Sequence, residues 1–284
     1  MPLEDSTSTE KRIISECKVM IVGEELKDII MSHLRRDVLN NTLAKGTRFD
    51  GRVFDEYRKI EIQSGVLTTA EGSALAMIGD TRVLSAVKFD VVKPFSDRPT
   101  EGVMVTNGEL LPTASPTFEP GPPNQYSIEL ARVVDRSIRS AECVDLNSFY
   151  IEPEKVLGLY IDLYVLNHSG NFTDTATLAA TSALLNAKMP KVEGGKIIRG
   201  EYTGKLKVSA VPLSTTMVKV GNHWLVDPSR EEERVVETHL TISTTEEHVC
   251  TIQKGKGSLS RDELLSNIDI AFKRGDDIRK MLKH

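Results

Sequence analysis

The spacing of apolar residues changes from helical to strand-like within the first third of the chain. Between residues 24 and 40, apolar side chains recur every four positions, which predicts an amphipathic helix. Residues 58–66 then alternate between apolar and polar, and residues 73–78 and 81–92 are short apolar runs, as expected of strands. A Gly-Asp pair at 79–80 separates the last two segments, so we expect a hairpin there.

A proline-rich region interrupts this pattern in the middle of the chain. Seven of the twelve prolines lie between residues 94 and 123, around one expected strand at 103–111. Residues 127–143 then have helical periodicity, and residues 156–166 have the pattern of a strand. The odd positions of that strand are apolar, whereas the even positions include Asp162, so only one face should belong to the core.

The last part of the chain predicts short strands between two helices. Asp174 is a suitable N-cap for a helix that should run to about Lys188 and be ended by Pro190. Ser260 and Glu263 form a capping box that should open a C-terminal helix. Four segments between these helices should be strands: 208–211, 216–220, 223–226 and 238–244. The order of elements predicts an α+β protein with mixed sheets.

Composition and charge exclude several classes of protein. The 36 Lys and Arg against 41 Asp and Glu give a net charge of −5, so any nucleic-acid contact must be local. The three cysteines never form a CxxC pair, which suggests neither disulfides nor zinc and fits a reducing cytoplasm. No apolar run approaches the roughly 20 residues of a membrane span, and no export signal is visible. Residues 1–10 have the Ser, Thr and acid-rich composition of a frayed terminus.

No motif for a metal or a cofactor is visible. The Gly-rich stretch Lys-Gly-Lys-Gly-Ser at 254–258 lacks Walker and GxGxxG spacing, and we interpret it as a hairpin turn. The six histidines show neither HxxxH nor HxH spacing. We therefore expect no metal and no cofactor.

Asp162 is a candidate site residue because of its surroundings. It lies mid-strand between apolar neighbours, where an ionised carboxylate is costly unless it is paired or hydrogen bonded. The alternative is a structural ion pair with an arginine from the following helix.

A row of arginines is a candidate phosphate-binding surface. Arg132, Arg136 and Arg139 lie on successive turns of the helix expected at 127–143. Alternatively, Glu129 and Asp135 neutralise them in pairs, which would make a solvated surface worth only about 0.2–0.5 kcal/mol per pair. The residues alone favour the second interpretation, a surface of paired charges.

Six short motifs together carry a family resemblance. They are Gly-Thr-Arg-Phe-Asp-Gly-Arg at 46–52, Glu-Gly-Ser-Ala at 71–74, Gly-Asp-Thr-Arg-Val at 79–83, Glu-Leu-Leu-Pro at 109–112, Phe-Glu-Pro-Gly-Pro-Pro at 118–123 and Ile-Glu-Leu-Ala-Arg-Val-Val-Asp-Arg at 128–136. In combination they resemble the RNase PH family, and the last three resemble its non-catalytic ring subunits in the archaeal exosome. The resemblance runs from about Lys45 to the C-terminus. It implies an RNase PH-like fold of the ribosomal protein S5 domain 2-like type.

The resemblance also implies a division of the chain. An N-terminal arm and helix at 1–45 would precede an RNase PH-like domain at 46–284. The first half of that domain would run to about residue 190 and the second half from 191 to the end.

The sequence departs from active family members at two places. Active members degrade RNA from its 3′ end with phosphate as the nucleophile, and they carry an Asp five residues after the strand aspartate, followed by a Gly-Gly-Thr-Arg type of turn. Here Asp162 is present, but Asn167 and then His168 stand at that place, and an amide is neither a general acid nor a base. Gln125 and Tyr126 stand where the active exosome subunit has paired arginines. These are degenerate active-site positions, and no catalytic residue is expected.

The resemblance implies partners as well. Active and inactive RNase PH-type subunits alternate as three heterodimers in a six-membered ring, and RNA-binding cap subunits join it. Arg132 and Arg136 match arginines that face the RNA path of the catalytic partner, where they would contact the backbone of single-stranded RNA without reading bases. We therefore expect a pseudoenzyme subunit of a 3′-to-5′ phosphorolytic exoribonuclease.

Two other functions stay open at this point. The chain could be a phosphate-dependent exoribonuclease in its own right, with His168 or Asp174 in the chemistry. A stand-alone RNA-binding module is disfavoured by the net charge and by an aromatic content of only 5%.

Overall fold

The computed structural model describes residues 38–282, and the chain falls into two compact units, residues 1–53 and 54–284. In the first unit, residues 38–43 are helical and are followed by turns, in which the Arg52 Nε atom donates to Asp50 at 2.7 Å. Most of the helix expected at 24–40, the first ten residues and Cys17 lie outside the described residues. Everything below concerns the second unit. The division at residue 45 stays a prediction.

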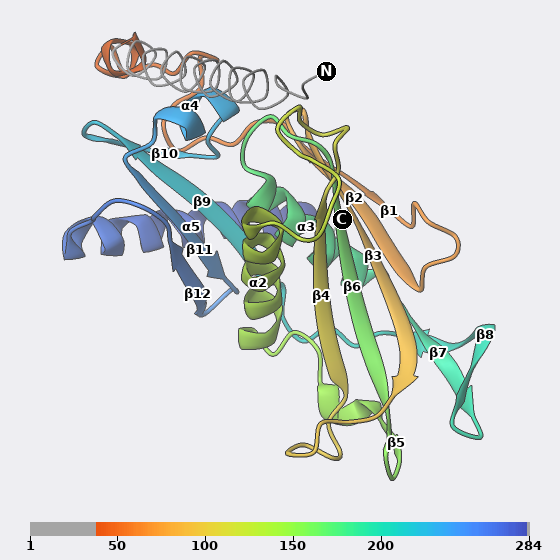
Figure 1. Cartoon of the computed structure of the whole chain (residues 1–284). Coiled ribbons are helices and arrows are strands. Elements are labelled where there is room, and N and C mark those ends of the chain that lie inside the picture. Colours follow the sequence, from red (N-terminus) through yellow and green to blue (C-terminus); the bar gives the residue numbers. More distant parts are fainter. Residues whose placement is uncertain (1–37, 283–284) are drawn as a thin grey trace, which may run out of the picture. The chain divides into compact units, whose positions relative to one another are not determined.

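A six-stranded sheet forms the first half of the second unit (Figure 1). Its main order is β1-β2-β3-β6-β4, and β5 pairs with β6 at one end. All pairs are antiparallel except β4 with β6, which is parallel. The strands are β1 (Ile60–Ser64), β2 (Gly72–Ile78), β3 (Thr81–Val92), β4 (Val103–Leu110), β5 (Tyr150–Glu152) and β6 (Lys155–Asn167). Alternation and turn residues thus predicted five of these strands, all except β5, and the β2–β3 hairpin correctly.

The two faces of β6 differ as its sequence predicts. Leu159, Ile161 and Val165 are fully buried, whereas Asp162 on the other face is half-buried. The buried face contributes to a core shared with α2 (Gln125–Ser140) and α3 (Phe172–Leu185). This packing fixes which side of the sheet is open to a ligand.

A second, four-stranded sheet has the order β10-β9-β11-β12. Its strands are β9 (Leu213–Val220), β10 (His223–Val226), β11 (Thr238–Thr244) and β12 (Val249–Lys254). The C-terminal helix α5 (Arg261–Leu282) packs against β9 and β11, and Ser260 opens it through the expected capping box with Glu263. Helix α3 packs on β2 and β3 of the first sheet and on β9 of the second. Together the sheets and helices form the expected α+β fold.

Helix α3 can lie between two sheets because its side chains are small. Ala176, Ala179, Ala180 and Ala183 are all fully buried. A Cβ atom at Gly72 of β2 would overlap the carbonyl oxygen of Ala183, so the strand and the helix touch through their backbones.

The limits predicted for this helix are wrong. Its N-cap is Asn171, in the left-handed conformation at φ 53°, and Asp174 is a buried residue of the first turn that hydrogen bonds elsewhere. The helix ends at Leu185. Pro190 does not terminate it but lies within β7 (Lys188–Glu193), which pairs with β8 (Lys196–Lys205) in a separate hairpin.

Other predictions in the second half also need correction. Residues 208–211 are not a strand, because they follow β8 as irregular chain before β9. The stretch at 254–258 is not a hairpin turn, because it leads from the end of β12 into α5. The sequence patterns also did not predict β5, the β7–β8 hairpin, β12, the short helix α4 (Arg230–Val235) or the 3-10 turn η1 (Leu146–Phe149).

Candidate functional site

Helix α2 presents the arginine row on its open face. Asn124 caps the helix by accepting a hydrogen bond from the Ser127 N–H at 2.9 Å. Leu130, Val134 and Ile138 are buried, so residues on the opposite side project outward. Three arginines on that side are exposed: Arg132, Arg136 and Arg139.

The acidic neighbours neutralise only one of these arginines. Arg139 pairs with Asp135 at 3.1 Å and also donates to the Met104 carbonyl. Glu129 instead accepts a hydrogen bond from Gln253 of β12. Within residues 38–282, Arg132 and Arg136 form no ion pair and no side-chain hydrogen bond, so two guanidinium groups are available to an anion.

Gln125 and Tyr126 begin the same helix. Both are exposed, and neither has a side-chain hydrogen bond within the described residues. An amide and a phenol at this position carry no positive charge, so this turn of α2 adds nothing to the charge of Arg132 and Arg136.

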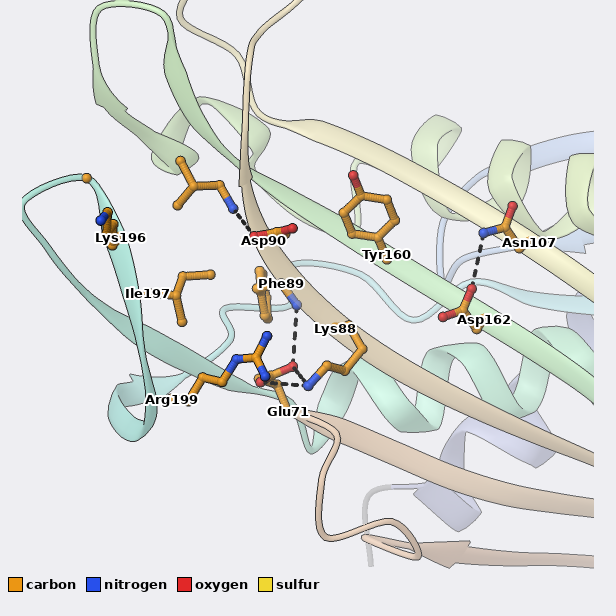
Figure 2. A pocket seen from close by; sticks show the side chains of 12 residues that line it. Glu71, Lys88, Phe89, Asp90, Asn107, Tyr160, Asp162, Lys196, Ile197 and Arg199 are labelled. Carbon is orange, nitrogen blue, oxygen red and sulfur yellow. Dashed lines mark hydrogen bonds and ion pairs between the residues drawn. The ribbon is translucent and has the colours of Figure 1, made fainter.

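Asp162 is satisfied by an amide and not by an arginine. The Asn107 Nδ2 atom of β4 donates to its carboxylate at 3.1 Å, because parallel pairing sets Asn107 opposite Asp162. The predicted alternative of an ion pair with an arginine of the next helix is therefore wrong. Figure 2 shows Asp162 and Asn107 at one end of a groove of about 710 Å³, away from Glu71, Lys88 and the β8 residue Arg199.

Asn167 closes the end of β6. Its Nδ2 atom donates to the Asp80 carbonyl in the β2–β3 turn at 2.5 Å. An amide makes this bond readily, whereas an aspartate carboxylate would face the same carbonyl oxygen without a proton to share. The side chain at this position therefore holds two turns together.

The backbone of the turn after β6 has no free donor among residues 169–171. The Ser169 N–H donates to Thr81, the Gly170 N–H to His168, and the Asn171 N–H to the Glu233 carboxylate at 2.7 Å. A phosphate usually binds such a turn through its N–H groups. Here a carboxylate of the protein already accepts one of these bonds.

Arg58 fixes the same turn from the other side. Its guanidinium donates to the carbonyls of Ser169 and Gly170 and forms a bidentate pair with Asp227 at 2.8 and 2.7 Å. The Asp227 side chain is fully buried, and the Arg58 side chain is 13% exposed. Sequence reasoning missed this pair because 169 positions separate its members.

His168 is buried between aromatic rings. It stacks on Phe118 with 5.6 Å between ring centroids and meets Phe172 edge-on at 5.1 Å. Burial, together with the nearby Arg230 and Arg58, lowers the pKa of His168 to about 4. The ring is therefore neutral near pH 7, and its Nδ1 atom accepts the Gly170 N–H. This geometry gives His168 a packing role.

Asp174 lies in the interior and not in an open site. Its carboxylate accepts four hydrogen bonds, from the Tyr57 hydroxyl, the Asn171 amide, and the Thr216 N–H and hydroxyl. Burial raises the pKa of Asp174 to about 6 against the opposing effect of these bonds. It connects β9 to α3, which is a structural role.

The described residues contain no group of three or more His, Cys, Asp or Glu side chains arranged to hold a metal ion. In that same part of the chain, no helix is long and apolar enough to cross a membrane. Cys143 and Cys250 are free thiols, and burial raises the pKa of Cys143 to about 12.

Comparison with known families identifies the class of protein. Domain 1 of the 3′ exoribonuclease family matches residues 56–190, and domain 2 matches residues 210–274. These matches cover well over half of the chain. The chain therefore belongs to the 3′ exoribonuclease family, also called the RNase PH family.

Within this family, the chain is similar to exosome components of one type. "Exosome complex component Rrp42" of Thermococcus gammatolerans is 47% identical, covering 89% of this chain and 95% of the relative. The protein of the same name from Archaeoglobus fulgidus is 45% identical, covering 89% and 98%. These similarities confirm the resemblance deduced from the short motifs.

Solved structures confirm the fold. A chain of the Archaeoglobus fulgidus exosome with RNA bound to the active site superposes with a TM-score of 0.82 at 44% identity, covering 89% of this chain and 99% of that one. A chain of an archaeal exosome core gives 0.79 at 40% identity, covering 91% and 99%. Rice Rrp46, at 18% identity and a TM-score of 0.65, shares the fold alone.

Proposed function

We propose that this chain is a non-catalytic ring subunit of an archaeal exosome core that holds the backbone of single-stranded RNA with Arg132 and Arg136. The observation that carries the proposal is that these two arginines are exposed on one face of α2 and unpaired within the described residues, while Arg139 is paired. Similarity to exosome components over 89% of the chain supports the same function.

The chemistry itself belongs to a partner subunit. At the positions where an active member would bind and attack phosphate, this chain has Asn167 bonded to a carbonyl and a turn whose N–H groups are occupied. His168 is neutral and packed between Phe118 and Phe172. Asn167, the N–H groups of residues 169–171 and His168 are therefore not available as an acid, a base or a donor to phosphate, which disfavours the alternative of an intrinsic exoribonuclease.

The similarity to chains of archaeal exosome cores supports a proposal for the assembly as well. The partner is a catalytic RNase PH-type subunit, with which the chain would form three heterodimers in a hexameric ring, and cap subunits that bind RNA would sit on that ring. A location in the cytoplasm stays a prediction from the sequence.

RNA binding by the reconstituted complex tests the role of the two arginines. The variant with both Arg132→Ala and Arg136→Ala should bind single-stranded RNA more weakly, and the slope of log K against log salt should fall by roughly 0.7 per lost contact. Arg139→Ala is the matched control, because it removes the same charge from the same helix at a paired position. An unchanged slope in the double variant, with the ring assembled, would contradict the proposal.

A second experiment tests the absence of catalysis. The pure chain, supplied with 3′ single-stranded RNA and inorganic phosphate, should release no nucleoside diphosphates, and release should begin when the catalytic partner is added. Phosphate-dependent release by the chain alone would show that it is an enzyme.

A further inference from the structure

Glu129 lacks the ion pair that its position on α2 favours. It precedes Arg132 by three residues, so the two side chains lie on adjacent turns of one helix, at a spacing that normally allows pairing. Two turns further on, Asp135 and Arg139 do form such a pair at 3.1 Å. The two acidic residues of one helix therefore behave differently.

The cause lies in the second sheet. The Nε2 atom of Gln253 donates to the Oε1 atom of Glu129 at 3.2 Å, and both side chains are half-buried. Gln253 is opposite Thr241 of β11 in the β11–β12 pair. Because β11 is also paired with β9 on its other side, the backbone at Gln253 is held in place. His239 of β11 is a second neighbour of Glu129. Burial lowers the pKa of His239, and the nearby negative charge of Glu129 raises it by a smaller amount. Glu129 is thus directed toward β11 and β12.

We infer that Gln253 is a positioning residue for RNA binding, which holds the Glu129 carboxylate against β12 and so keeps the Arg132 guanidinium free for a phosphate. The inference rests on the proposed function, because it concerns the availability of an arginine assigned there to RNA. Gln253 is 124 positions away from Glu129 in the sequence and belongs to the second sheet, in the other half of the fold.

The Glu129 carboxylate and an RNA phosphate would compete for the guanidinium of Arg132. Without Gln253, Glu129 loses its hydrogen-bond donor and can turn to Arg132, where an exposed Glu–Arg pair three residues apart is weakly favourable. An RNA phosphate would then have to displace that carboxylate and would meet its negative charge. Both effects weaken RNA binding, and both require the charge of Glu129.

The test compares four versions of the chain in the reconstituted ring: Gln253→Ala, Glu129→Gln, the two combined, and Gln63→Ala. Gln63 is an exposed glutamine on β1 and is the matched control. We expect Gln253→Ala to weaken the affinity for a single-stranded oligonucleotide about two- to fivefold. Its salt slope should fall by up to roughly 0.7, the value for one phosphate contact. The combined variant should regain the affinity and slope of Glu129→Gln, whereas Gln63→Ala should match the unmodified ring.

The RNA affinities of these variants distinguish a wrong proposed function from a wrong role for Gln253. If Arg132→Ala together with Arg136→Ala leaves RNA binding unchanged, the proposed function is wrong. If that double variant weakens binding but Gln253→Ala behaves like Gln63→Ala, the positioning role is wrong. If Gln253→Ala weakens binding and Glu129→Gln does not restore it, Gln253 acts only through the fold, and the inference is overturned. Thermal melting of each ring shows whether the β12 edge has been damaged.

Discussion

The open face of α2 and the turn after β6 differ in whether their charged groups have partners within the protein. On α2, Arg132 and Arg136 project into solvent without partners among the described residues. In the turn, Arg58 is bound to Asp227 and to two carbonyls, and the Asn171 N–H is bound to Glu233. One region keeps its capacity to bind an anion, and the other has used that capacity internally.

The difference is between a turn whose donors are used within the protein and a helix surface whose guanidinium groups stay open to an anion. A catalytic turn must leave donors unsatisfied until the substrate arrives, which costs stability. In this chain the corresponding turn is closed by its own side chains. A surface helix bears no such cost, because water solvates its unpaired arginines.

The largest expected effect comes from breaking the closed turn. Arg58→Ala removes the guanidinium that pairs with the buried Asp227 carboxylate and with the Ser169 and Gly170 carbonyls. Removing one partner of a buried ion pair typically costs about 3–5 kcal/mol, so the free energy of unfolding should fall by that order. Denaturant titration of the unmodified chain and of the variant measures this loss in the free energy of unfolding.

Arg132→Ala is the matched control for Arg58→Ala, since it also removes one guanidinium. Its effect on unfolding should lie within about 0.5 kcal/mol, as is usual for exposed positions. If Arg58→Ala and Arg132→Ala lost the same free energy of unfolding, the turn after β6 and the open face of α2 would not differ in the way described.

A smaller effect should appear in the pH dependence of stability. The pKa of His168 is lowered to about 4 from an ordinary value of 6.5, so the folded chain binds fewer protons than the unfolded chain between these values. Stability from this group is present above pH 6.5 and is lost as the pH falls toward 4, by about 1–3 kcal/mol. The stability difference between the unmodified chain and His168→Gln should therefore shrink over this interval.

Two carboxyl groups act in the opposite direction. Burial raises the pKa of Asp174 to about 6 and that of Glu233 to about 7, so both favour the folded state as the pH falls through these values. The comparison with His168→Gln removes the contribution of Asp174, whereas the Glu233 Oε2 atom lies 3.9 Å from the His168 Nε2 atom, so the measured difference also contains any change in the titration of Glu233. A difference that stays constant from pH 7 to pH 4 would show that His168 titrates normally.

The smallest expected effect concerns the paired arginine of α2. Arg139→Ala removes the pair with Asp135 and the bond to the Met104 carbonyl, both on a partly exposed surface. We expect a loss of about 0.3–0.5 kcal/mol in the free energy of unfolding and little change in RNA binding. If Arg139→Ala weakened RNA binding as much as Arg132→Ala does, Arg139 would also belong to the RNA-binding surface.

The sequence predicted elements whose signals are local. The alternation in β6 and the Gly-Asp turn before β3 need only a few neighbouring residues to be recognised, and the capping box at Ser260 was correct for the same reason. Asn171 was missed as a cap because Asp174 has the same local signature and its competing partner, Thr216, is 42 positions away.

The candidate site was predictable to a similar extent. The arginine row follows from helical spacing, but which arginine is paired depends on whether Glu129 meets Gln253 from a distant strand. The hairpin of β7 and β8 was not predicted, although the Gly-Gly pair at 194–195 is a recognisable turn signal. The Arg58–Asp227 pair had no local signal at all.

Helix α3 has a consequence for the folding of the chain. Its alanines are buried against the first sheet, while Thr177 and Thr181 bond to Ser214 and to the Pro212 carbonyl, so one helix connects the two family domains. The second sheet has a small core of its own with α5, but the core of the first sheet includes Leu213 of β9 and Ile278 of α5, so a fragment cut between the domains would expose apolar side chains of the first. Residues 54–282 should accordingly melt in a single transition, and neither half should be inherited or shuffled as an independent module.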